Sequence, residues 1–157
     1  MSGVFAPEVL DTERWGPIAL PAIERILEAR ERDRLPHALL LVGPEGAGRE
    51  LAAVEAAALL VCGGSAPFTG DGCRRRVRLG HHPDVEVVLP PEGKKRIVIE
   101  QVRQVADSAR VRPYEGACRV WIIAGAEARC LGAEAANAFL KTLEELSLIH
   151  ISEPTRL

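Results

Sequence analysis

The spacing of hydrophobic and polar residues predicts helices that alternate with short strands. Apolar residues recur at helical spacing, with charged or small residues between them, in four stretches. These predicted helices are Ile18–Arg32, Arg49–Cys62, Ile97–Arg110 and Ala133–Leu143. Two runs without polar alternation, Ala38–Val42 and Val120–Ile123, are typical of strands buried on both faces, and a third strand is predicted at Val85–Leu89. Strands separated by helices imply a parallel sheet with right-handed crossovers, and therefore an α/β domain.

The stretch between Gly63 and Gly80 has the composition of a loop. It is rich in glycine, serine, proline, threonine and arginine. Four of its arginines lie close together, at Arg74, Arg75, Arg76 and Arg78. A solvated basic loop is the simpler interpretation, and contact with phosphate groups is the alternative.

A glycine-rich loop joins the first predicted strand to the second predicted helix. It matches the spacing G-x-x-x-x-G-K-[ST] of a phosphate-binding loop at both glycines, and departs from it at the lysine and at the hydroxyl. Arg49 takes the lysine position, where its planar guanidinium does not replace a compact ammonium, and Glu50 puts a carboxylate where a hydroxyl would meet Mg²⁺. The pattern predicts a degenerate phosphate loop with the binding residues Gly43, Gly46, Gly48 and Arg49. A plain strand-to-helix turn is the alternative.

The second metal ligand of such a site is also missing. In hydrolysing P-loop enzymes an aspartate follows a later apolar strand. Here the predicted strand Val120–Ile123 is followed by Ala124-Gly125-Ala126-Glu127, without that aspartate and without an adjacent glutamate base. We therefore expect no catalytic residues and no ATP hydrolysis, with ATP bound without hydrolysis as an alternative.

Composition and charge narrow the class of protein. The 157 residues carry 20 Lys plus Arg against 22 Asp plus Glu. This balance excludes an overall positive charge that would attract nucleic acid to the whole surface. No apolar run approaches the roughly 18 residues of a membrane span, and the first residues lack the pattern of an export signal. The cysteines Cys62, Cys73, Cys118 and Cys130 are too sparse for a disulfide scaffold. We interpret them as thiols, and expect a cytoplasmic protein without a membrane partner.

Several sequence blocks between Trp15 and Glu145 occur in an order known from one family. They are RLPHALL (34–40) leading into GPEG (43–46), GHHPDV (80–85), IEQVR (99–103) and EAANAFLKTLEE (134–145). In these blocks the chain resembles the delta-prime subunits of the bacterial DNA polymerase III clamp loader, which are AAA+ proteins. The resemblance implies a P-loop AAA+ (RecA-like) fold and a subunit that typically does not hydrolyse ATP itself. The first two blocks also occur in the ATP-hydrolysing gamma/tau subunit, so a gamma/tau-type subunit or another P-loop ATPase is the alternative.

The resemblance also implies a role and partners. Delta-prime subunits are largely rigid members of a five-subunit ring that loads the sliding clamp onto primed DNA during replication. The expected partners are therefore the gamma/tau and delta subunits, and indirectly the sliding clamp and primed DNA. A third class, a stand-alone DNA-binding module, would depend on Arg74–Arg78.

Members of this family usually carry a zinc site in the segment between the P-loop helix and the His-Pro-Asp block. Its four cysteines have the spacing C-x₈-C-x₂-C-x₂-C, whereas this chain offers only Cys62 and Cys73 there. Two thiols do not complete a structural zinc site, and His81 and His82 are the alternative source of two further ligands. We expect no metal, and keep zinc on Cys62 and Cys73 as the alternative.

The end of the sequence departs from the family pattern. After Glu145 the family continues with a proline, a further strand and C-terminal regions for assembly, and none of these is recognisable here. Residues 146–157 match nothing in the family and look like translated vector or adapter sequence, with natural divergence as the alternative. We therefore expect a truncated AAA+ domain at 1–145, incomplete at its C-terminus, and a non-native tail at 146–157.

Overall fold

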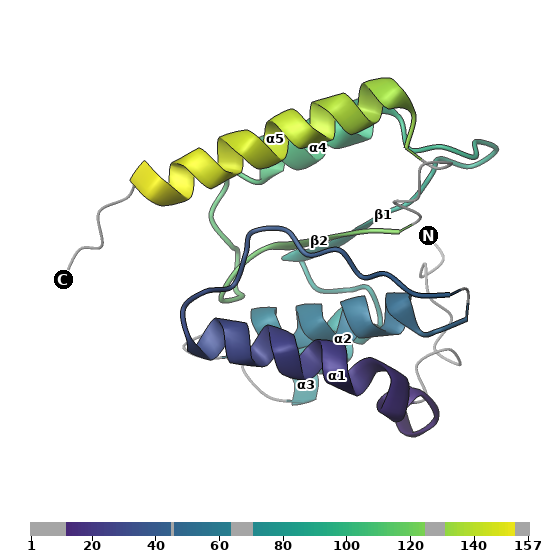
Figure 1. Ribbon diagram of the computed structural model, residues 1–157, viewed down its shortest axis with the longest axis vertical. Coiled ribbons are helices and arrows are strands. Elements are labelled where there is room, and N and C mark those ends of the chain that lie inside the picture. The colour runs from purple at the N-terminus through teal and green to yellow at the C-terminus, as the bar shows by residue number, and fades with distance from the viewer. Residues whose placement is uncertain (1–11, 45, 64–70, 125–130, 153–157) are drawn as a thin grey trace. The chain divides into compact units, whose positions relative to one another are not determined.

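A computed structural model of the chain describes residues 12–44, 46–63, 71–124 and 131–152 (Figure 1). In these residues the elements follow in the order α1 (Thr12–Glu31), α2 (Arg49–Val61), α3 (Asp71–Arg78), β1 (Val85–Val88), α4 (Ile99–Ser108), β2 (Val120–Ile123) and α5 (Ala133–Ser152). The strands β1 and β2 pair in a small parallel sheet. The predicted class, an α/β fold with a parallel sheet and flanking helices, is confirmed.

The described residues form two compact units. The first unit contains residues 12–35, 40–87 and 112–124, and the second contains residues 36–39, 88–111 and 131–152. In the first unit, α2 packs against α1, α3 and β2. In the second unit, α4 and α5 lie side by side (Figure 1).

Helix α2 is the centre of the first unit. Alanine and aliphatic residues fill most of its sequence, which gives it high helix propensity and a small cross-section. Its residues Val54, Ala58 and Val61 are buried in one hydrophobic cluster with α3 and with Ile122 of β2. A second cluster joins α2 to Ile26 of α1. Because α2 is buried against several neighbours, it fixes the glycine-rich loop at its start and the cysteine at its end.

The predicted elements agree with the structure best where they are buried. The bounds of α2 and β2 are confirmed to within one residue, β1 ends one residue early, and α4 is two residues shorter at each end. Helix α1 begins earlier than predicted, at Thr12, and includes Pro17 and Pro21, while α5 continues to Ser152. Apolar periodicity reports the part of a helix that packs, whereas the hydrogen bonds that extend a helix lie within the helix itself.

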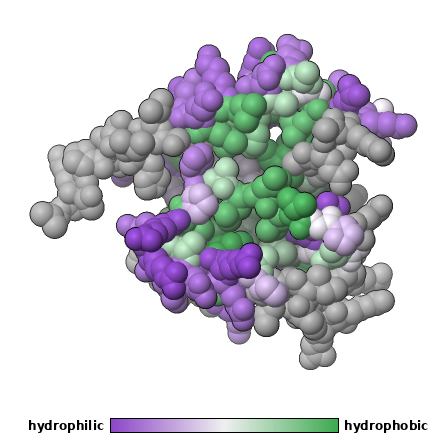
Figure 2. Space-filling view, viewed as in Figure 1, coloured by the Kyte–Doolittle hydropathy of each residue, from purple (hydrophilic) through white to green (hydrophobic). Residues whose placement is uncertain are grey.

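The segment predicted as the first strand, Ala38–Val42, belongs to no strand, so this prediction is wrong. Within the described residues the sheet contains β1 and β2. Leu39, Leu40 and Val42 are 47%, 76% and 83% exposed, the opposite of a strand buried on both faces. The space-filling view shows hydrophobic surface over the connection between α1 and α2 (Figure 2). An apolar run becomes a buried strand only where neighbouring strands supply its hydrogen bonds and other elements cover its faces.

The segment predicted as a basic loop contains a helix, which corrects the interpretation of α3. Cys73 and Val77 are one helical turn apart and are 4% and 3% exposed. Asp71 lies in the first turn and arginines lie in the last turn, and both placements suit the helix dipole. Two apolar positions in eight residues are too few for the helical period to stand out in the sequence.

Candidate functional site

The glycine-rich loop leads directly into the N-terminus of α2. The Ala47 N–H donates to the Pro44 carbonyl at 3.2 Å, which closes a turn. Gly46 and Gly48 have φ angles of 79° and 75°, in the left-handed region that favours glycine. Gly48 is the N-cap residue of α2, and as a glycine it provides no side-chain cap for this helix end. The backbone is therefore that of a loop and helix terminus suited to phosphate groups.

The side chains of the loop differ from those of a hydrolytic site. A Cβ atom added to Gly43 would lie 3.7 Å from the aliphatic carbons of Arg49, so the Arg49 side chain runs back beside the loop. Glu50 is exposed in the first turn of α2, where the helix dipole stabilises its carboxylate. A carboxylate here repels a triphosphate and replaces the hydroxyl that Mg²⁺ needs. Ala124 follows β2, and residues 125–127 lie outside the described part of the chain.

Two of the cysteines are bonded to each other. Cys62, directly after α2, and Cys73, in α3, form a disulfide with their Cα atoms 5.8 Å apart. The prediction that all four cysteines are thiols is therefore wrong for this pair, whereas Cys118 is free and Cys130 lies outside the described residues. Sparse spacing in the sequence did not reveal the pair, because α2 and α3 meet only through tertiary packing.

The fold brings His82, and not the exposed His81, to this cysteine pair. His82 is 3% exposed, and one of its ring nitrogens lies within 4.8 Å of both sulfur atoms. Its Nδ1 accepts a hydrogen bond from the Asp84 N–H at 3.1 Å, so the neutral imidazole carries its proton on Nε2. A histidine that binds metal needs a free lone pair on one nitrogen and donates from the other. With the sulfurs bonded to each other as well, these residues do not fit the zinc site of the alternative interpretation.

We expect the purified protein to contain far less than one zinc ion per chain. The reason is that Cys62 and Cys73 are joined, and that the position of the His82 proton opposes coordination. Elemental analysis of protein purified without chelators measures the zinc content. One zinc per chain, lost in a Cys73→Ser variant and retained in a Cys118→Ser control, would contradict this expectation.

Asp84, the last residue of the His-Pro-Asp block, holds the loop that precedes β2. Its Oδ1 accepts a hydrogen bond from the Tyr114 N–H at 2.7 Å, and its Oδ2 accepts from Glu115 at 2.9 Å and from Gly116 at 2.7 Å. The Asp84 carbonyl accepts from the Val120 N–H at 2.9 Å, where β2 begins. The side chain is fully buried and joins the start of β1 to this loop from inside. In the sequence, Asp84 contributes only to the family resemblance, and no local pattern indicates its structural role.

The pKa values of Asp84 and His82 are both below their ordinary values. Burial opposes the charge of Asp84, but the N–H donors of Glu115, Tyr114 and Gly116 outweigh burial and lower its pKa. Burial is the main cause of the lowered pKa of His82, against the opposing effect of the Glu115 carboxylate. Asp84 therefore contributes stability above pH about 4 that is lost as the pH falls through its lowered pKa. His82 reduces stability below pH about 6.5, because the unfolded chain takes up that proton first.

Two of the arginines of α3 form ion pairs with carboxylates of the same unit. Arg78 binds the Glu55 carboxylate through two hydrogen bonds of 2.6 and 2.8 Å, which tie α3 to α2. Arg76 pairs with Glu115 at 2.5 Å, which ties α3 to the loop before β2. Arg75 is exposed. The predicted cluster of solvated charges is therefore divided, and contact of its exposed part with phosphate groups stays a prediction.

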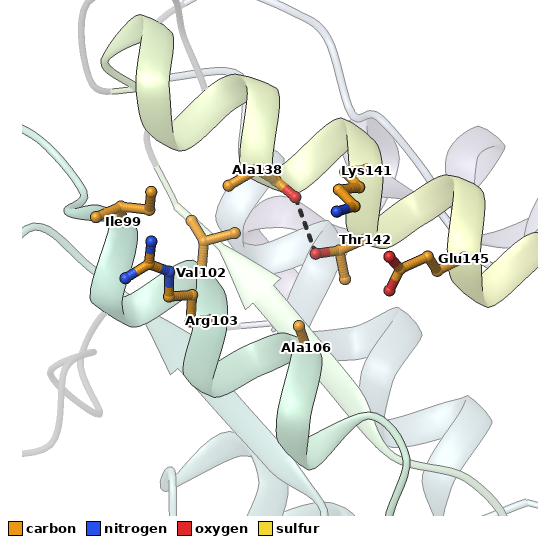
Figure 3. A pocket seen from close by; sticks show the side chains of 8 residues that line it. All are labelled: Ile99, Val102, Arg103, Ala106, Ala138, Lys141, Thr142 and Glu145. Carbon is orange, nitrogen blue, oxygen red and sulfur yellow. Dashed lines mark hydrogen bonds between the residues drawn. The ribbon is translucent and has the colours of Figure 1, made fainter.

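A groove of about 290 Å³ lies between α4 and α5 in the second unit (Figure 3). Apolar, hydroxyl and charged side chains line it: Ile99, Val102, Arg103, Ala106, Ala138, Lys141, Thr142 and Glu145. The Thr142 hydroxyl donates to the Ala138 carbonyl at 2.9 Å, and the Glu145 carboxylate pairs with Arg110 at 3.2 Å. Because these two polar groups are used within the fold, we assign the groove no catalytic role.

Comparison with known proteins identifies relatives of this chain. The sequence profile of the family described as "DNA polymerase III, delta subunit" matches residues 20–147. A protein of Escherichia coli named DNA polymerase III subunit delta' is 31% identical over 136 residues, which cover 84% of this chain and 40% of that protein. The protein of the same name in Pseudomonas aeruginosa is 38% identical over 129 residues, which cover 77% of this chain and 39% of that protein. A DNA polymerase III subunit gamma of Buchnera aphidicola is 32% identical over 117 residues, which cover 71% of this chain and 30% of that protein.

The chain spans about two fifths of the length of the delta' relatives it matches. The matched region contains the glycine-rich loop, the cysteine pair and the loop held by Asp84. Within the described residues, no helix combines the length and the apolar character that crossing a bilayer requires.

Proposed function

Because this chain belongs to the DNA polymerase III delta-subunit family, we propose that it is part of a delta-prime-type clamp-loader subunit that supports DNA replication without hydrolysing ATP. One observation carries the proposal: two glycines with positive φ lead into the N-terminus of α2, and Arg49 and Glu50 stand where a phosphate loop has its lysine and its hydroxyl. Such a subunit contributes shape and contacts to an assembly, and leaves phosphoryl chemistry to other subunits.

The partners follow from this role. The relatives' names assign them to DNA polymerase III. For this chain we propose assembly with the gamma/tau and delta subunits, and through them with the sliding clamp and primed DNA. We further propose that the chain acts in the cytoplasm, where the bacterial chromosome is replicated.

An ATP-hydrolysing gamma-type subunit is the second candidate. The similarity to the gamma subunit of Buchnera aphidicola favours it. Hydrolysis would require a lysine and a hydroxyl side chain where this chain has Arg49 and Glu50. These two residues support the delta-prime type over the gamma type.

We expect no magnesium-dependent ATP hydrolysis above background, although the loop's backbone N–H groups still allow weak nucleotide binding. Steady-state release of phosphate from Mg-ATP measures this. Arg49→Ala is the informative variant, and Arg25→Ala on the exposed face of α1 is a control for loss of surface charge. Phosphate release that requires magnesium and disappears in Arg49→Ala alone would contradict the proposal and favour the gamma type.

We propose that residues 1–145 belong to an AAA+ domain and that residues 146–157 contribute nothing to it. The family match ends at residue 147, which supports this boundary. Helix α5 nevertheless continues to Ser152, so the apolar run Leu148–Ile151 is helical and does not form a strand.

Deletion of residues 146–157 is expected to change the melting temperature by no more than about 2 °C, since the proposed boundary places these residues outside the domain. The resemblance implies that assembly depends mainly on C-terminal regions outside this chain. The 157-residue chain should therefore not co-elute with gamma and delta subunits in size-exclusion chromatography. Co-elution, or strong destabilisation on deletion, would count against the proposed boundary.

A further inference from the structure

The disulfide lies beside a buried imidazole whose proton has no hydrogen-bond partner in the part of the chain that the structure describes. The His82 side chain is 1% exposed, and its Nε2 has no partner among the described residues. Glu115 Oε1 lies 3.4 Å from Nε2 without hydrogen-bond geometry. A buried donor without an acceptor is costly, and such groups in native proteins call for an explanation, a redox role among them.

Reduction of the disulfide would create an acceptor for this proton. One ring nitrogen of His82 lies within 4.8 Å of both sulfur atoms, and Nδ1 is already engaged by Asp84. A thiolate accepts a hydrogen bond from an N–H group far better than a disulfide sulfur does. Cys73 is also the third residue of α3, where the helix N-terminus favours negative charge.

We propose that Cys62 and Cys73 are a reversible dithiol–disulfide pair, and that His82 donates a hydrogen bond from Nε2 to the reduced sulfur of Cys73. The electron donor is a dithiol, either a small molecule or a protein with a paired-cysteine site. This inference is independent of the proposed role in clamp loading, because it rests only on the contacts around the disulfide.

The exchange proceeds in two balanced steps. A thiolate of the dithiol attacks the Cys62 sulfur, the bond between Cys62 and Cys73 breaks, and Cys73 leaves as a thiolate beside His82. The second thiolate of the dithiol then attacks the first sulfur of the dithiol, which is bonded to Cys62 in the mixed disulfide. This closes the disulfide of the dithiol and releases Cys62 as a thiolate. Two electrons pass from the dithiol to the pair, and the two protons that the dithiol loses go to Cys62 and to Cys73 or solvent.

The fold holds α3 in place in both states. The two hydrogen bonds between Arg78 and Glu55 and the burial of Val77 do not depend on the disulfide. Reduction therefore removes a covalent link between α2 and α3 without removing their packing. The redox state then sets how firmly α3 is attached, together with the loop that Arg76 contacts through Glu115.

The test is the redox equilibrium of the full chain in dithiothreitol buffers. Free thiols are alkylated, the disulfide is then reduced and labelled with a second reagent, and mass spectrometry gives the oxidised fraction at Cys62 and Cys73. We expect one reversible transition. His82→Phe should shift it about tenfold toward the disulfide, which is about 30 mV for a two-electron couple. The exposed neighbour provides the matched control, since His81→Phe should not shift it.

A measurement on the unmutated chain tests the proposal even where the His82→Phe variant does not fold. In nitrogen-15-edited NMR, the chemical shift of the proton on His82 Nε2 should move downfield on reduction, because this proton gains a hydrogen-bond acceptor. Four results would overturn the proposal: no reversible transition at the pair, equal shifts in His81→Phe and His82→Phe, an unchanged Nε2–H resonance, or tight binding of one added zinc ion by the reduced chain.

Discussion

Replacement of Asp84 by asparagine should lower the free energy of unfolding by about 4 kcal/mol. The Asp84 carboxylate accepts three backbone hydrogen bonds in a fully buried position, at Tyr114, Glu115 and Gly116. An asparagine has one acceptor oxygen, and its NH₂ group would face N–H donors. The loop before β2 would therefore lose its attachment to the start of β1. Urea denaturation monitored by circular dichroism measures the loss.

The matched control is Asp107→Asn, an exposed position on α4, which should change the free energy of unfolding by less than about 0.5 kcal/mol. The pH dependence gives a second check. The parent protein should lose stability as the pH falls below about 4, where the lowered pKa of Asp84 makes the unfolded chain take up the proton first. Asp84→Asn should lack this part of the acid dependence. Equal effects of the two substitutions would refute the structural role of Asp84.

Replacement of Gly116 by alanine should lower the free energy of unfolding by about 3 kcal/mol. A Cβ atom at this position would lie 2.5 Å from Val61 Cγ1, 3.1 Å from the Cys118 carbonyl oxygen and 3.2 Å from Asp84 Oδ2. Val61 is fully buried at the centre of the core and has no room to move away. The loop itself would have to shift, and its hydrogen bond to Asp84 would lengthen. Thermal unfolding of the two proteins measures the effect.

Gly72→Ala serves as the control for this substitution. A Cβ atom at Gly72 meets nothing within 4 Å, and the residue lies exposed in α3. Alanine should leave stability unchanged or raise it by up to about 1 kcal/mol, because glycine is a poor helix former. A Gly116→Ala protein as stable as the parent would show that the loop is not held against α2.

Patterns with a local physical cause were predicted from the sequence. The helix α2 follows from alanine content and apolar period, and β2 from an uninterrupted apolar run. The spacing of Gly43 and Gly48 placed a loop before a helix start, as observed. The departures from the phosphate-loop motif at Arg49 and Glu50 were also visible in the sequence, because the residue at each motif position is read directly.

Contacts between distant segments could not be predicted in this way. The Cys62–Cys73 bond and the placement of His82 beside it depend on how α2 and α3 pack, and the spacing of these residues carries no such information. In the sequence, Asp84 looks like any polar residue before a strand. Its role depends on three N–H donors that lie some thirty residues away along the chain.

The sequence by itself determined the α/β class, the positions of α2 and β2, the glycine-rich loop before α2 and the family resemblance, because each depends on residue identity or on neighbours within one segment. Tertiary structure alone decided that Ala38–Val42 has no strand partner among the described residues, that two cysteines are bonded, and that Asp84 holds the loop before β2. Hydrogen-bond partners, burial and sulfur pairing are properties of segments brought together in space, so the free energy that selects them appears only when the core assembles.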